Sequence, residues 1–218
     1  MKYVINCGGQ YDKWPVPKQL TPINGEPLVA RTIRLLRENG VEDIAICSNQ
    51  DGFEGFGVPV LKHENEYRLG LDNANGHWLN GFMYFEEPTC YLFGDVVFSP
   101  DAIKTIVEYD DEDIMFFASA EPLPKGYPKQ WAEPFAFKVK DMESFFNAID
   151  RAKFYDQEGC FYRMAVSWEL WQVIKRTPLN RINYNNYVAI NDYTCDIDTP
   201  EDAKFYESLE GRILKTWG

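Results

Sequence analysis

Two glycines and two lysines near the start of the chain have the types and spacing of a phosphate-binding loop. Gly8 and Gly9 follow the apolar run 3–5, and Lys13 and Lys18 come shortly after them. Glycine lets backbone N–H groups approach phosphate oxygens closely, and lysine adds a positive point charge. The segment fits a triphosphate site, although a strand-to-loop turn with solvated lysines explains the same residues.

Three aspartates are candidates for holding a metal ion. Asp95 comes directly after the apolar run 91–93 and Gly94. Asp196 and Asp198 alternate in an extended stretch, so their side chains are expected on the same side of the chain. Magnesium binds one or two carboxylates together with phosphate oxygens. Capping of a turn is the alternative for Asp95, whereas capping of the next helix leaves Asp196 and Asp198 unexplained.

Apolar segments alternate between strand and helix patterns. Helical spacing covers 28–39 with Gly40 as its cap, and the serine, proline and aspartate at 99–101 open a second helix. Strands are expected at 3–5, 44–47, 58–61, 91–93, 114–118 and 135–139, with further helices at 142–153, 168–176 and 200–214. This order predicts a mostly parallel sheet covered by helices. Polar residues gather after three strands, at 8–9, 48–49 and 94–95, which predicts a ligand site at the carboxyl edge of that sheet.

Composition limits the class of protein. The 218 residues are 45% hydrophobic, which suits one folded domain, and the net charge of −12 argues against a nucleic-acid partner. Five cysteines without a C-x-x-C spacing indicate neither disulfides nor a zinc site. The sequence has no apolar run long enough for a membrane span and no recognisable signal peptide, so a reducing cytoplasm is the expected compartment.

The order of the motifs resembles a known family. The chain carries, in sequence, Gly8-Gly9, Pro17-Lys18-x-Leu20, Gly25-x-Pro27-Leu28, Gly94-Asp95 and the run 196–202, which reads DIDTPED. This pattern is similar to that of the nucleotidyltransferase superfamily of sugar-nucleotide pyrophosphorylases and cytidylyltransferases. The resemblance implies one domain over 1–218 with a Rossmann-like nucleotidyltransferase fold. That fold is an α/β, three-layer α/β/α sandwich with a mostly parallel, mixed sheet.

The resemblance also implies the nucleotide contacts. The residues that would lie against the nucleotide follow the first and fourth expected strands: Cys7, Gly8, Gly9 and Gly94. Gly70 and Asn73 stand where relatives read the base, and a polar helix start is the alternative for that stretch. The nucleotide-binding half would cover about residues 1–120, and an acceptor-binding half about 121–218.

The resemblance also implies catalytic roles for several charged residues. Lys18 matches the lysine at the phosphate where bonds change, and Lys13 stands in the place of an arginine on the outer phosphates. Asp95 and Asp198 match the acids that bind Mg²⁺, with Asp196 as a helper. Two departures concern the loop: Tyr11 replaces a glycine, and Lys13 lacks the bidentate fork of arginine.

The implied reaction joins a nucleoside triphosphate to a small phosphorylated alcohol or sugar with release of pyrophosphate. The short chain favours CTP and a precursor of cell-surface polysaccharide or lipid, by analogy with compact relatives. Lys138 is the candidate for the acceptor phosphate, because its strand is expected to run along the pocket. Compact relatives are often dimers, so a homodimer is the expectation.

Two other functions remain open at this point. A glycosyltransferase on a similar sheet would use Asp95 for the metal of a sugar nucleotide, but such enzymes usually carry a D-x-D pair, whereas Asp95 is followed by Val96 and Val97. A non-catalytic nucleotide-binding or regulatory domain of the same fold is favoured by the altered residues Tyr11 and Lys13.

Overall fold

The computed structural model describes residues 1–8, 14, 16–63, 79–120, 132–163 and 165–216, with side chains described up to residue 209. Within these ranges no helix is both long and apolar enough to cross a bilayer.

The described residues form a seven-stranded sheet with the order β10-β8-β9-β6-β1-β4-β5. Its strands are β1 (Lys2–Asn6), β4 (Ile44–Ser48), β5 (Val60–Lys62), β6 (Thr89–Phe93), β8 (Ile114–Ser119), β9 (Glu133–Val139) and β10 (Val188–Ala189). β9 is antiparallel to both of its neighbours, β6 and β8, and the other paired strands run parallel. The predicted α/β fold with a mostly parallel, mixed sheet is therefore confirmed.

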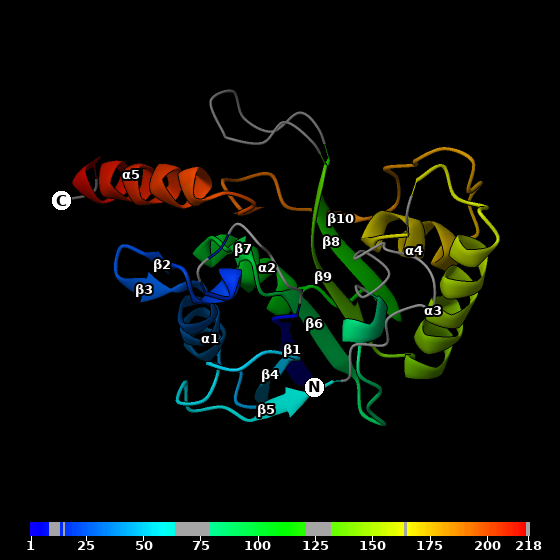
Figure 1. The fold of residues 1–218 in the computed structure, drawn as a ribbon, viewed down its shortest axis with the longest axis horizontal. Helices are drawn as coiled ribbons and strands as arrows, with labels where there is room; N and C mark the ends of the chain where they lie inside the picture. Colours follow the sequence, from blue (N-terminus) through cyan, green and yellow to red (C-terminus); the bar gives the residue numbers. More distant parts are fainter. Residues whose placement is uncertain (9–13, 15, 64–78, 121–131, 164, 217–218) are drawn as a thin grey trace.

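Helices lie on both sides of this sheet (Figure 1). On one side are α1 (Leu28–Glu38) and α2 (Pro100–Glu108), and on the other are α3 (Met142–Gln157) and α4 (Ser167–Ile174). α2 begins as its sequence predicts, because the Ser99 hydroxyl accepts a hydrogen bond of 2.9 Å from the backbone N–H of Ala102. The last helix, α5 (Pro200–Thr216), projects away from the sheet in Figure 1.

The main core includes residues of the helices on both sides of the sheet, and between the sheet and α3 and α4 it is rich in aromatic rings. Phe116 and Phe137, on neighbouring strands, stack with ring centres 4.5 Å apart. Trp168 of α4 meets Phe116 edge to face at 4.9 Å, and Phe145 of α3 lies 5.4 Å from Phe137. Such aromatic contacts add to the free energy gained by burying the rings, so they fix α3 and α4 onto the sheet.

A second, smaller core attaches the end of the chain to its beginning. It joins the start of α5 to a hairpin of β2 (Pro22–Ile23) and β3 (Glu26–Pro27) and to the antiparallel pair β7 (Val96–Val97) and β11 (Cys195–Asp196). Its buried members are Ile23, Leu28, Val97, Cys195, Ile197, Ala203 and Tyr206. The sequence analysis did not predict these four short strands, which are too brief to show an alternating pattern.

Gly94 sets how closely the ends of β1 and β6 approach. Its N–H donates a 2.9 Å hydrogen bond to the carbonyl of Asn6. A Cβ atom at this position would stand 2.6 Å from the Cys7 sulfur and 2.7 Å from the Asn6 carbonyl oxygen. Glycine is therefore needed for the close approach that brings Asp95 to the end of β1.

We predict that Gly94→Ala lowers the free energy of unfolding by about 1–3 kcal/mol, because the added methyl group overpacks two neighbours that cannot both move. Gly81→Ala is the matched control, since the nearest atom to its added Cβ would be Asn6 Nδ2 at 4.0 Å. Urea titration of both variants measures the difference. Equal midpoints for the two variants would contradict the steric argument.

Lys138 corrects one of the predictions for the site. Because β9 runs antiparallel to β6, its later residues lie at the amino edge of the parallel strands, away from the predicted ligand site. The Lys138 side chain is buried and donates hydrogen bonds of 2.9 and 2.7 Å to the carbonyls of Val107 and Tyr109. These carbonyls belong to the end of α2, where a cation interacts favourably with the helix dipole. The placement gives Lys138 a structural role and does not support acceptor binding.

Lys138→Met is expected to lower the free energy of unfolding by about 2 kcal/mol, because it removes hydrogen bonds from a charged donor and leaves their carbonyl partners unpaired. The pyrophosphate release that the sequence leads us to expect should stay unchanged per folded molecule. Calorimetry gives the first quantity, and an assay corrected for the folded fraction gives the second. A fall in turnover without a fall in stability would return Lys138 to the acceptor site.

Candidate active site

The polar ends of three parallel strands meet at one edge of the sheet, as predicted. Asn6 at the end of β1 pairs in register with Cys47 of β4 and with Phe93 of β6. The residues that follow these strands are therefore brought together, and they include Gly8 and Asp95. The carboxyl edge of a parallel sheet is the usual place for a ligand, so this edge is the candidate active site.

Lys18 lies between two of the predicted metal ligands. Its Nζ is 2.7 Å from Oδ2 of Asp95 and 3.2 Å from Oδ1 of Asp198. The lysine side chain is 1% exposed, that of Asp95 is 21% exposed and that of Asp198 is 56% exposed. We call these three residues the Lys18 cluster. A buried ammonium needs anionic partners, and here two acids from distant parts of the sequence provide them.

A short 3-10 helix, η1 (Lys18–Leu20), holds the lysine in place. The carbonyl of Pro17 accepts a hydrogen bond of 2.8 Å from the N–H of Leu20. Next to Lys18, the buried Gln19 donates its amide N–H to the Gly8 carbonyl at 3.3 Å. The proline-lysine element is therefore tied directly to the glycine that follows β1.

Asp198 is positioned by the second core. The N–H of Ile197, which follows β11, donates a 2.9 Å hydrogen bond to the Asp95 carbonyl and so ties the two acidic segments together. The carboxylate of Asp202 accepts hydrogen bonds of 2.9 and 2.8 Å from the N–H groups of Asp198 and Thr199. Thr199 caps the start of α5, since its hydroxyl accepts a hydrogen bond of 3.3 Å from the Asp202 N–H. These bonds fix the turn into α5.

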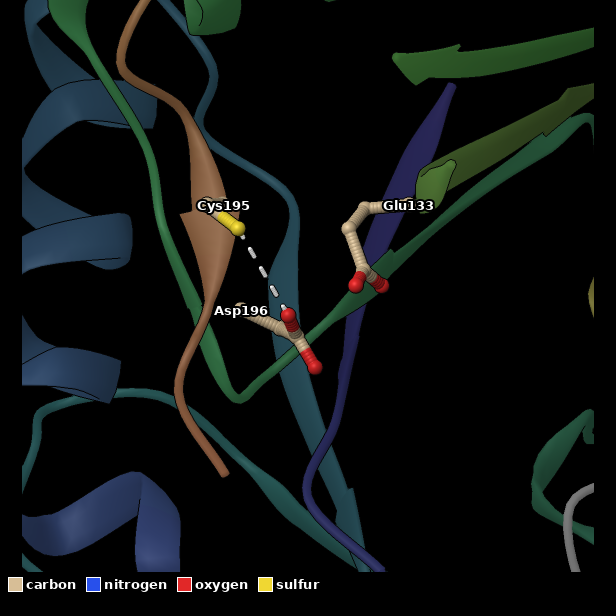
Figure 2. A group of neighbouring side chains, drawn as sticks. All are labelled: Glu133, Cys195 and Asp196. Atoms are coloured by element: carbon tan, nitrogen blue, oxygen red, sulfur yellow. Dashed lines mark hydrogen bonds between the residues drawn. The ribbon is translucent and has the colours of Figure 1, made fainter. Parts of the chain in front are cut away.

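Asp196 belongs to a different group from Asp198. Its carboxylate, the Cys195 thiol and the carboxylate of Glu133 offer ligand atoms that all lie within 4.8 Å of one another. Figure 2 shows Glu133 at the start of β9 facing Asp196 on β11. The sequence analysis missed Glu133, because the residue stands before the expected strand 135–139 and no motif surrounds it. The two acids expected on one side of the chain are divided between this group and the Lys18 cluster.

Gly8 lies against two polar side chains that the sequence analysis did not assign. A Cβ on Gly8 would stand 3.1 Å from Nε2 of His63 and 3.7 Å from Oδ1 of Asn49. Asn49 directly follows β4 and belongs to the polar pair 48–49. Its place at the end of a strand is the sequence signal that could have identified it. His63 directly follows β5, and a lone histidine gave no such signal.

Four predicted site residues lie outside the described part of the chain: Gly9, Lys13, Gly70 and Asn73. Their roles, and the effect of Tyr11 on the loop, stay predictions. Within the described part, Gly8, Lys18, Gly94, Asp95 and Asp198 lie at the same edge of the sheet.

Cys7 lies beneath this edge as a protonated thiol. Burial raises its pKa well above the usual value, and the negative charge of Asp95 raises it further. Burial also raises the pKa values of Cys47 and Cys90 to about 12. A thiol with a raised pKa carries little thiolate at neutral pH and reacts slowly. Cys7 is therefore suited to packing and not to nucleophilic chemistry.

We expect a thiol reagent such as Ellman's reagent at pH 8 to modify Cys160 alone in the folded protein, because the other four cysteines are buried. Cys160→Ser should remove the fast reaction, and all remaining thiols should react in guanidinium chloride. Absorbance stopped-flow and peptide mapping measure the rate and the site. Rapid modification of Cys7 would contradict its burial beside Asp95.

Comparison with known proteins gives concordant results. The chain is 34% identical over 104 residues to the molybdenum cofactor guanylyltransferase of Rhodobacter capsulatus, which is 43% of this chain and 54% of that protein. This chain thus spans about half the length of that relative.

Two solved structures share the fold. One is a protein assigned as a glucose-1-phosphate thymidylyltransferase from Bacillus anthracis, with a TM-score of 0.57, 14% identity and coverage of 95% of this chain and 94% of that chain. The other is the inositol-1-phosphate CTP transferase of T. maritima, with a TM-score of 0.55, 17% identity and coverage of 96% and 94%.

A family model covers most of the region that builds the site. The model of the MobA-like NTP transferase domain matches residues 3–147, from β1 into α3. The match includes the Gly8 turn, Lys18 and Asp95, whereas Asp198 lies beyond it. The chain belongs to the family of MobA-like NTP transferase domains.

Proposed function

We propose that this protein transfers a nucleotidyl group from a nucleoside triphosphate to a small phosphorylated acceptor and releases pyrophosphate. The observation that carries the proposal is the Lys18 ammonium between Asp95 and Asp198 at the carboxyl edge of the sheet. A lysine and two acids in that place supply a positive charge for a phosphate and oxygen ligands for a divalent cation. Membership of the MobA-like NTP transferase family supports the same reaction class.

In the proposed reaction, a phosphate oxygen of the acceptor attacks the α-phosphorus of the triphosphate. A new P–O bond forms, the bond from the α-phosphorus to the oxygen that bridges to the β-phosphorus breaks, and pyrophosphate leaves with that electron pair. The attacking phosphate is already anionic near neutral pH, so no residue has to remove a proton. Lys18 stabilises the negative charge that builds on the α-phosphate, as a charge aimed at the transition state does.

Asp95 and Asp198 fit a divalent cation. Oδ2 of Asp95 and Oδ1 of Asp198 both lie within 3.2 Å of one cationic nitrogen, so the two carboxylates already converge on a single positive charge. Carboxylate oxygens are the ligands that Mg²⁺ takes in phosphate-transfer sites. Bound there, Mg²⁺ would offset the charge between the two phosphate groups.

The second acid of the site argues against a glycosyltransferase. Asp95 is followed by Val96 and Val97, which are fully buried in β7, so the second acid of a D-x-D pair is missing there. β7 instead pairs with β11 and brings in Asp198 from the far end of the chain. This arrangement favours nucleotidyl transfer over sugar transfer from a nucleotide.

The relatives point to two pairs of nucleotide and acceptor. The inositol-1-phosphate CTP transferase, which shares the fold, favours CTP with a phosphorylated alcohol or sugar. The guanylyltransferase relative favours GTP with molybdenum cofactor as the acceptor. We therefore propose these two pairs as the first to be compared.

The reaction is tested by measuring pyrophosphate release with each of the four ribonucleoside triphosphates, Mg²⁺ and a panel of acceptors. The panel holds small phosphorylated alcohols, sugar phosphates and molybdenum cofactor. Release should require one triphosphate and one acceptor together. Asp95→Asn should lower kcat about 10²- to 10³-fold, as loss of a group that stabilises the transition state does.

Asp101→Asn is the matched control, because Asp101 is an exposed acid in the first turn of α2. Its turnover should stay within about twofold of the wild type, as expected of a surface change away from the site. Nucleotide binding without pyrophosphate release from any pair would instead identify a non-catalytic nucleotide-binding domain.

A further inference from the structure

The position of Lys18 coincides with the position that a divalent cation needs. The ammonium lies 2.7 Å from Oδ2 of Asp95 and 3.2 Å from Oδ1 of Asp198. A dication bound to the same two oxygens would lie within a few ångströms of the ammonium, and like charges at that distance repel strongly in a partly buried site. Lys18 and a free divalent cation therefore compete for the same carboxylates.

Moving the Lys18 ammonium away from Asp95 and Asp198 is unfavourable unless another anion replaces them. Its side chain is 1% exposed, and a buried charge that loses its partners is strongly disfavoured. Movement away from the acids is favourable when another anion arrives within reach. The phosphates of a nucleotide bound at the end of β1, beside Gly8, supply such an anion, and Gln19 already connects η1 to that turn.

We propose that Lys18 is a resident counter-ion that excludes free divalent cations from Asp95 and Asp198 until a triphosphate draws its ammonium away. The inference rests on the proposed function, because it takes a nucleoside triphosphate as the ligand. It adds an order of events: the cation joins the site together with the nucleotide and not before it. In nucleotide-free protein the two acids then stay paired with Lys18.

The experiment measures binding of Mn²⁺ alone, by electron paramagnetic resonance of the free ion, to wild-type protein and to Lys18→Met. The wild type should bind Mn²⁺ weakly at this site, and Lys18→Met should bind it at least tenfold more tightly. Lys18→Arg keeps the positive charge and should remain as weak as the wild type. Lys104→Met removes an exposed lysine of α2 and is the control for a general change in net charge.

Thermal unfolding gives a second readout on the same proteins. Millimolar Mg²⁺ without nucleotide should raise the Tm of Lys18→Met and leave that of the wild type unchanged. If circular dichroism shows that Lys18→Met does not fold, Lys18→Gln takes its place, since it keeps a polar end that can bond the acids. Asp95→Asn in the Lys18→Met background should abolish the gained Mn²⁺ affinity.

Equal Mn²⁺ affinity of the wild type and the neutral Lys18 variants would overturn the proposal and leave the Lys18 cluster as a structural ion pair. The two proposals fail separately. If no pyrophosphate is released but Lys18→Met still gains Mn²⁺ affinity, the proposed nucleotidyl transfer is refuted and the role of Lys18 as a counter-ion stands. If the wild type releases pyrophosphate but Lys18→Met gains no Mn²⁺ affinity, the nucleotidyl transfer stands and the role of Lys18 as a counter-ion is refuted.

Discussion

The site depends on the pairing of one buried positive charge, the ammonium of Lys18, with two carboxylates. Lys18 is enclosed, and its ammonium is satisfied by Asp95 from the end of the central strand β6 and by Asp198 from the segment before the last helix. Leaving the charge unpaired at this depth would cost several kcal/mol. Three segments that are far apart in sequence must therefore be placed correctly for any one of them to be stable.

Each of the two hydrophobic cores positions a different one of the acidic segments. The large aromatic core fixes the sheet, and with it the edge where β1, β4 and β6 end. The small core packs α5 and the β7–β11 pair against the β2–β3 hairpin. Asp95 thus depends on the first core and Asp198 on the second, while Lys18 joins them. The geometry of the site therefore depends on both cores.

The sequence was sufficient to predict the features that follow from local patterns. The periodic segments gave most of the strands and helices, and the motif order gave Lys18, Asp95 and Asp198, which the structure brings together. The direction of β9 depends on how the chain returns to the sheet, and no local pattern encodes this. That is why Lys138 was placed at the wrong edge and why Glu133 was missed. The single-domain assignment and the dimer stay predictions.

The cluster also sets when the site can form. Lys18 and Asp198 are 180 positions apart, so their contact belongs to the most non-local in the chain. Contacts of high sequence separation form late, because the entropy of closing the intervening loop must be overcome first, and a ribosome delivers residues from the amino end. A nascent chain therefore carries an incomplete charge pattern at the sheet edge until the DIDTPED segment has emerged. The Lys18–Asp198 contact can therefore form only after residue 198 has been synthesised and has returned to the edge of the sheet.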